Sequence, residues 1–142
     1  MLRAIRGATT ASVNTEEEIL TSVGELLSGL LEANQLGADH LVCAFFSSTP
    51  DLDAAFPAKA ARELGWTDVP LFGAQELAVA GAPARCVRVM LMADVPSDDR
   101  PRPARHLYLR EARSLRPDFA AAGGAGAGSL LSSAFGFYFY RR

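Results

Sequence analysis

The clearest pattern in the chain is a stripe of apolar residues with helical spacing. Its members are Ile19, Leu20, Val23, Leu26, Leu27, Leu30 and Leu31, which fall on one face of an α-helix. Thr15 followed by Glu18 forms a capping box, so the helix is expected to begin after Thr15 and to end near Asn34. Gly24 and Gly29 each lower helix stability by about 1 kcal/mol relative to alanine. We interpret them as the part of the helix that presses closely against a sheet.

Apolar runs predict five strands around this helix. They span residues 2–10, 41–47, 69–72, 86–93 and 105–109. A short helix is predicted from Ala58 to Leu64, because Pro57 suits the first turn of a helix and Gly65 suits its end. In the loop before it, Asp51 can cap the segment that follows. The combination indicates the α+β class, with a mixed five-stranded sheet packed on one long helix plus short helices.

Arg88 is the most unusual residue in these runs, because it lies inside the apolar strand 86–93. A guanidinium cannot lose its charge, so its burial requires a carboxylate, a phosphate or an anionic ligand beside it. Both faces of that strand are otherwise apolar, which predicts burial on both sides, and one long helix cannot cover both faces of a sheet. We therefore expect a partner subunit on the second face.

Other charged residues lie in segments 5–10, 49–64 and 75–76, where strands and tight loops disfavour them. Several arginines placed in this way indicate a pocket for a small, multiply charged anion. The alternative is that Arg6 and Arg88 form structural ion pairs with Glu63, Glu76 or Asp51.

Several further candidates also have an ordinary structural interpretation. Alternation of Tyr108 with His106 and Arg110 is typical of a solvent-exposed strand face. Lys59 and Arg62, three residues apart on the short helix, are typical surface charges. The residues by themselves therefore support an anion-binding α+β domain and leave its activity open.

The composition narrows the classes of function. The chain has 142 residues and a formal net charge of −2, so we expect one domain and no surplus of basic residues for nucleic acid. The cysteines and histidines lack zinc-site spacing, no secretion signal is present, and no apolar stretch reaches the ~18 residues that span a bilayer. We expect a cytoplasmic protein without metal, cofactor, nucleic-acid or membrane partner.

No nucleophile motif is present, so an enzyme of this sequence would need neither nucleophile nor cofactor.

The character of the chain changes at residue 120. Residues 120–128 are rich in glycine and alanine, and residues 135–142 alternate aromatic side chains. We predict a domain over residues 1–119 and a disordered tail over residues 120–142. The alternative is that the aromatic end adds a strand to this chain or to a neighbour.

Four motifs together resemble one enzyme family. They are IRGATT at 5–10, SSTPDL at 47–52, FPAKAAR at 56–62 and CVRVM at 86–90. In this order and spacing they closely resemble the monofunctional AroH-class chorismate mutases, the trimeric Bacillus-type α/β enzymes, over residues 1–119. The resemblance implies a Claisen rearrangement of chorismate to prephenate in aromatic amino-acid biosynthesis, without a cofactor. It also implies a homotrimer that forms a pseudo-α/β barrel with sites between subunits, Arg6 of one chain completing a pocket formed by Glu76 and Arg88 of another.

The resemblance assigns roles to individual positions. Arg88 would donate to the ether oxygen, Arg6 and Tyr108 would bind a carboxylate, and Glu76 would accept from the ring hydroxyl. The remaining substrate-binding residues that it implies are Phe56, Ala58, Lys59, Arg62, Phe72, Gly73, Ala74, Gln75, Leu115 and Arg116.

One segment departs from the family pattern. Before Gln75 and Glu76 the family commonly carries small polar side chains, whereas this chain has Phe72, Gly73 and Ala74. A hydrogen bond to the ring hydroxyl would then be missing, which affects affinity more than reaction type. Two alternatives stay open: an enzyme like the trimeric enamine/imine deaminases, and a non-catalytic anion-binding regulatory domain.

Overall fold

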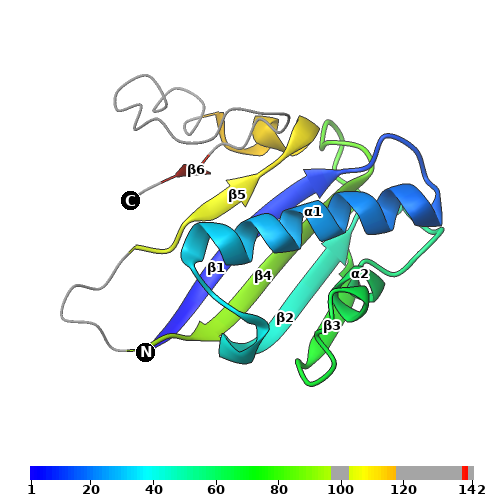
Figure 1. The fold of residues 1–142 in the computed structure, drawn as a ribbon. Helices are drawn as coiled ribbons and strands as arrows, with labels where there is room; N and C mark the ends of the chain where they lie inside the picture. The colour runs from blue at the N-terminus through cyan, green and yellow to red at the C-terminus, as the bar shows by residue number, and fades with distance from the viewer. Residues whose placement is uncertain (97–102, 118–138, 141–142) are drawn as a thin grey trace, which may run out of the picture.

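The long helix of this protein crosses one face of a twisted mixed sheet, as seen in a computed structural model that describes residues 1–96, 103–117 and 139–140 (Figure 1). The strands are β1 (Leu2–Thr10), β2 (Leu41–Ser48), β3 (Leu71–Gln75), β4 (Cys86–Asp94), β5 (His106–Tyr108) and β6 (Phe139–Tyr140). The helices are α1 (Glu16–Asn34) and α2 (Ala58–Glu63), with 3₁₀ turns η1 (Ala38–His40) and η2 (Arg110–Leu115). The predicted α+β class is confirmed.

The strands are ordered β3-β2-β4-β1-β5-β6, with β4 near the middle of the sheet. β4 pairs antiparallel with β1 on one side and with β2 on the other. β3 joins β2 in parallel, and β5 joins β1 in parallel. Two strands from the first third of the chain therefore flank β4, which is the strand that carries Arg88.

The predicted apolar stripe of α1 forms the core against the sheet. Ile19, Val23, Leu26, Leu27 and Leu30 are fully buried there. They pack in one cluster with side chains of β1, β4 and β5, namely Ile5, Val87, Val89, Leu91 and Leu107. Burial of each such side chain contributes about 1.5–3 kcal/mol, so this layer accounts for much of the stability of the fold.

The ends of α1 follow the sequence signals. The hydroxyl of Thr15 accepts a hydrogen bond from the backbone N–H of Glu18 at 3.3 Å, which is one half of the predicted capping box. The other half is replaced, because the carboxylate of Glu18 accepts from the backbone N–H of Ser12 at 2.9 Å. At the other end Gln35 adopts a left-handed conformation with φ 56°. The side-chain amide of Asn34 accepts from the backbone N–H of Arg105 and donates to its carbonyl, at 2.8 and 2.9 Å. The helix end therefore also fixes the start of β5.

The interpretation of Gly24 as a close-packed position is wrong. A Cβ added at Gly24 would meet nothing within 4 Å, although Gly29 is buried. The close approach occurs instead at Gly7 of β1, where a Cβ would lie 2.7 Å from a methyl group of Leu30 and 3.0 Å from one of Leu26. The missing side chain in the strand, and not that in the helix, lets the two elements approach.

Three local predictions need correction. The third strand covers residues 71–75 and not 69–72, because Leu71 is the first residue that pairs with β2, opposite Ala44. The last predicted strand is shortened to three residues, because Arg110 turns the chain away with φ 51°. Asp51 does not cap the segment after it; its carboxylate accepts from the backbone N–H of Arg85 at 2.8 Å and so fixes the start of β4.

The two residues of β6 pair antiparallel with β5, with Tyr140 opposite His106. This is the kind of added strand given above as the alternative for the aromatic end, and the remainder of segment 120–142 lies outside the described residues. Within the described part of the chain, none of the helices is long and apolar enough to cross a membrane. The same residues contain no group of three His, Cys, Asp or Glu side chains that could hold a metal ion.

Candidate active site

The face of the sheet opposite α1 carries a continuous row of in-register residues. From β3 to β5 the row consists of Ala74, Ser47, Arg88, Ala8 and Tyr108. Side chains on one face of in-register strands point the same way, so the row places polar groups of three strands on one surface. Part of this face is open in the single chain, since Met90 of β4 is 38% exposed. The expected burial of β4 on both sides is therefore not achieved by this chain.

Arg88 forms an ion pair with Glu76 at the middle of this row. The Nε of Arg88 lies 2.7 Å from Oε1 of Glu76, and the Glu76 side chain is only 12% exposed. Ser47 donates its hydroxyl to the same carboxylate oxygen at 2.8 Å, and the backbone N–H of Glu76 donates to Ser48 at 2.9 Å. The structural ion pair considered above thus exists, and it joins two of the predicted catalytic residues.

Glu76 holds the inner part of the Arg88 side chain, and the rest stays accessible. The Nε of Arg88 is buried against the carboxylate, whereas the side chain as a whole is 36% exposed. Arg88 is therefore a fixed cation that a ligand on this face can still reach.

Cys86 lies on the same face, two residues before Arg88, and is fully buried. Burial, and then the negative charge of Glu76, raises the pKa of its thiol to about 11, while Arg88 acts in the opposite direction. The thiol is neutral near pH 7, so it supplies a small apolar wall and no nucleophile.

A cavity of about 770 Å³ opens where β2 and β3 end and α2 begins. Six of the predicted substrate-binding residues line it: Phe56, Ala58, Lys59, Gly73, Ala74 and Gln75. We call these six residues the cavity group. Ser47 also lines the cavity and donates to Glu76, so it connects the cavity with the Arg88–Glu76 pair. Within the single chain, the ammonium of Lys59 pairs with Glu16 at 2.6 Å.

A second set of predicted residues lies at the β5 side of the sheet. It comprises Arg6, Tyr108, Leu115 and Arg116, and we call it the edge group. Tyr108 is only 7% exposed and packs with Ala8 and Cys86, with Leu115 against the same cluster. The interpretation of Tyr108 as part of a solvent-exposed face is therefore wrong.

His106 lies beside two members of the edge group. Its Nδ1 accepts from the backbone N–H of Arg6 at 3.0 Å. Burial lowers the pKa of His106, and the positive charges of Arg6 and Arg116 lower it further. The imidazole is thus kept neutral, as an acceptor on Nδ1 requires. The register places the exposed Arg6 opposite Met90 of β4, on the same face as Arg88.

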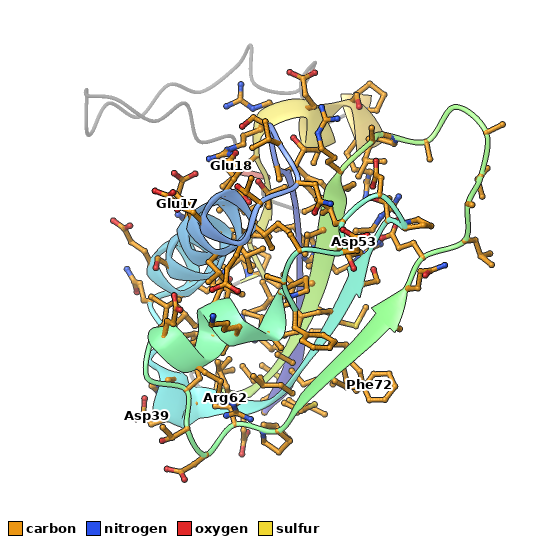
Figure 2. All side chains as sticks on the ribbon, turned by 90° about the vertical axis from the view of Figure 1, so that its right-hand side faces the viewer. Glu17, Glu18, Asp39, Asp53, Arg62 and Phe72 are labelled. Carbon is orange, nitrogen blue, oxygen red and sulfur yellow. The ribbon has the colours of Figure 1, made fainter. Side chains whose placement is uncertain are left out.

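Two predicted residues are not brought to these groups. The guanidinium of Arg62 donates to the backbone carbonyls of Trp66, Thr67 and Val69, and Figure 2 shows it below α2. Phe72 projects from β3 away from α2 (Figure 2) and packs edge-to-face on Phe45, with ring centroids 6.2 Å apart. In this chain both side chains have structural contacts outside the cavity.

Sequence reasoning missed Ser47 as a functional residue. Two signals mark it: Ser47 and Ser48 are hydroxyl residues at the end of an otherwise apolar strand, and Ser47 begins the family motif SSTPDL. The contact with Glu76 depends on the parallel pairing of β2 with β3, which local sequence does not specify.

Comparison with known proteins identifies the family. The family model of chorismate mutase type I matches residues 2–119. Chorismate mutase AroH of Bacillus subtilis (strain 168) is 46% identical over 123 residues, covering 84% of this chain and 94% of the relative. Chorismate mutase AroH of Thermus thermophilus is 44% identical over 125 residues, covering 86% and 99%.

A solved structure also matches the fold. It is a chorismate mutase from Clostridium thermocellum, with a TM-score of 0.73 and 42% sequence identity, covering 79% of this chain and 98% of that one. Sequence and fold agree: the chain belongs to the type I, AroH-class chorismate mutase family.

Proposed function

We infer that this protein is a chorismate mutase, which rearranges chorismate to prephenate in the biosynthesis of phenylalanine and tyrosine. The observation that carries the proposal is Arg88, a cation held 2.7 Å from the carboxylate of Glu76 on the open sheet face, with 36% of its side chain exposed. The rearrangement transfers no group between molecules, so it requires no nucleophile or cofactor. It requires a compact conformer of the dianion and stabilisation of charge on the ether oxygen.

Arg88 stabilises the charge on the ether oxygen. Negative charge grows on the ether oxygen as the C–O bond breaks ahead of C–C bond formation, and a fixed guanidinium N–H stabilises that charge. The carboxylate of Glu76 and the hydroxyl of Ser47 hold this cation in place, so little reorganisation is needed during the reaction. Glu76 also accepts from the ring hydroxyl of the substrate.

The cavity group and the edge group together hold the dianion in its compact conformer. Phe56 and Ala58 wall the pocket, Lys59 attracts the dianion, and Arg6 and Tyr108 bind a carboxylate. Leu115 and Arg116 close the site.

The separation of the two groups supports sites shared between chains. Ala74 and Tyr108 lie four strand spacings apart in the sheet order, which is about 19 Å at ~4.8 Å per strand. One small dianion cannot span that distance, whereas the cavity group of one chain can face the edge group of another. The exposed apolar side chains Phe45, Phe72 and Met90 lie on the same face and suit a subunit interface. We propose a closed homotrimer in the cytoplasm.

The direct test is consumption of chorismate by the purified full-length chain. Arg88→Ala should lower kcat/KM by about 10²–10³ through loss of one preorganised donor. Arg88→Lys should stay strongly impaired, because an ammonium does not reproduce the planar fork. Arg3→Ala, which removes an arginine from the neighbouring strand β1, is the matched control and should keep wild-type kinetics.

The alternatives predict different outcomes of the same assay. Turnover of an enamine or imine without turnover of chorismate would identify a deaminase-like enzyme. Chorismate binding without turnover would indicate a regulatory domain in which the Phe72–Gly73–Ala74 segment has disabled the site. Wild-type turnover by Arg88→Ala would remove Arg88 from the mechanism.

A further inference from the structure

The side chain of Arg110 points to α1, whereas that of Tyr108 packs on the opposite face of the sheet. Its guanidinium lies between two carboxylates of α1, with Nη1 at 2.6 Å from Oε1 of Glu18 and Nη2 at 3.1 Å from Oε2 of Glu25. Nη1 also donates to the carbonyl of Thr10, the last residue of β1, at 3.2 Å. One side chain thus connects the helix, the strand and η2.

The carboxylate of Glu18 is itself held firmly. It accepts from the backbone N–H and the hydroxyl of Ser12, both at 2.9 Å. The backbone hydrogen bond of Ser12 is the largest cause that lowers the pKa of Glu18, and the hydrogen bond and charge of Arg110 lower it further. Glu18 is at the N-terminal end of α1 (Figure 2), so it is an ionised, fixed anchor for Arg110 near pH 7.

The backbone at Arg110 is also unusual. Its φ of 51° is in the left-handed region, which non-glycine residues adopt at a cost of about 1 kcal/mol. The turn that this conformation makes ends β5 and starts η2. Next to it, the backbone N–H of Glu111 donates to the hydroxyl of Thr10 at 3.2 Å. The contacts of Arg110 therefore hold a turn that the chain would not adopt by intrinsic preference.

The turn determines where η2 lies on the catalytic face. Ala112 of η2 is fully buried and packs with Ala8, Cys86 and Tyr108, and Leu115 packs on the same cluster. Ala8 is directly opposite Arg88 in the sheet. The position of η2 therefore also determines the position of Leu115 and Arg116 relative to Arg88.

We propose that Arg110 is a positioning residue that locks η2, and through it Arg116 and Leu115, onto the site by its double ion pair with Glu18 and Glu25. This inference rests on the proposed function, in which Arg116 and Leu115 close the site over the substrate. Arg110 contacts no substrate and acts only by fixing the segment that does.

The kinetic test compares Arg110→Gln with Arg110→Lys. Both substitutions leave a non-glycine residue in the left-handed backbone conformation, so the two variants differ only in the side chain. Arg110→Gln removes the charge and should raise KM for chorismate about fivefold while kcat changes less than about twofold. Arg110→Lys keeps the charge and should recover part of this loss. Glu25→Gln should shift KM in the same direction by a smaller factor. Glu32→Gln, an exposed carboxylate on the same helix, should leave the kinetics unchanged.

A double-mutant cycle tests whether Arg110 acts through Arg116. If it does, Arg110→Gln should raise KM by a smaller factor in an Arg116→Ala background than in the wild type, because residues that act as a unit are non-additive. An equal rise of KM in both backgrounds, or no rise in the wild-type background, would overturn the proposal.

Hydrogen exchange separates this inference from the proposed function. The amides of Glu111 and Ala112 should exchange faster in Arg110→Gln than in the wild type, with no change in the core of α1. This measurement needs no turnover, so a chain that fails to convert chorismate would refute the proposed function while leaving the test of Arg110 intact. Unchanged exchange of these amides would refute the positioning role.

Discussion

At the residue scale, the chemistry of the site depends on how single side chains are supported by their neighbours. Without a partner, the charge of Arg88 within an apolar strand would destabilise the fold. The carboxylate of Glu76 compensates for this charge. Glu76 in turn depends on the hydroxyl of Ser47. The functional unit at this scale is thus a chain of three side chains from three strand regions.

The first prediction concerns Ser47→Ala. Loss of the hydroxyl removes a hydrogen bond to a charged group, worth about 1.5–3 kcal/mol, and lets the Glu76 carboxylate move. We expect kcat/KM for chorismate to fall by about ten- to a hundredfold, together with a fall in the free energy of unfolding of at most about 3 kcal/mol. Ser28→Ala on the exposed side of α1 is the control and should have no effect on turnover. Full activity of Ser47→Ala would show that Glu76 does not need this support.

The second prediction concerns the reactivity of Cys86. With a pKa of about 11, only about one thiol in a thousand is ionised at pH 8, and the thiolate is the reactive form. Iodoacetamide at pH 8 should therefore modify the partly exposed Cys43 before Cys86. Mass spectrometry of the native and the denatured chain measures this, and equal rates for both cysteines in the native chain would contradict it.

Cys86 also makes stability depend on alkaline pH. A free thiol titrates near ~8.5, below the value of about 11 in the folded chain. Between these values the folded state keeps a proton that the unfolded state has lost, so the free energy of unfolding should fall as pH rises from about 9 to 11. Denaturant titrations across this range should show a slope that Cys86→Ala lacks.

At the element scale, the packing of α1 on β1 is decided by one position. Gly7 lets Leu26 and Leu30 approach the strand, while Gly24 has open space around it. The sequence contains both glycines without any mark of this difference. Only the rotation of the helix relative to the strand distinguishes them.

A pair of alanine substitutions tests this packing. Gly7→Ala should lower the free energy of unfolding by about 1–3 kcal/mol, because its Cβ would overlap with the methyl group of Leu30. Gly24→Ala should raise the free energy of unfolding by up to about 1 kcal/mol through helix propensity. Urea denaturation of both variants checks these opposite signs, and a stabilised Gly7→Ala would show that the helix can shift at no cost.

At the scale of the whole molecule, the row from Ala74 to Tyr108 lies on one face of the sheet. The two halves of the proposed site are at opposite ends of this row, one near β3 and the other near β5. An oligomer resolves this separation by joining the β3 side of one subunit to the β5 side of the next. The sequence led us to expect Arg6 and Arg88 on different chains within a shared site. From their place on adjacent strands of one face, we propose instead that one chain supplies both to the same site, and hybrid oligomers distinguish the two arrangements.

The prediction for the assembly uses hybrid oligomers. Ala74→Trp should block the cavity group and Arg6→Ala should disable the edge group, so each protein alone should be inactive. After dissociation and joint reassembly, some activity should return, because a hybrid interface combines one intact group from each chain. A mixture of Arg6→Ala and Arg88→Ala should stay inactive by the same reasoning. No recovery in the first mixture despite subunit exchange, or a fully active monomer, would refute shared sites.

Several features of the fold followed from sequence alone because they depend on local interactions. The stripe of apolar residues and the Thr15–Glu18 cap specify α1, since helix formation and capping involve residues three or four apart. The unbroken apolar run around Arg88 specified a strand and a charge that needed a partner. The motifs also identified the family, which the comparisons confirmed.

The rest was decided by tertiary structure. The pairing of Glu76 with Arg88 and Ser47, the close approach at Gly7 and the anchoring of Arg110 by Glu18 and Glu25 all join residues far apart in the chain. Each depends on strand register or on the rotation of a helix, and these are set by the packing of all the elements together. Local pattern therefore determined which elements form and which residues carry charge, whereas the register of the sheet decided which charges meet.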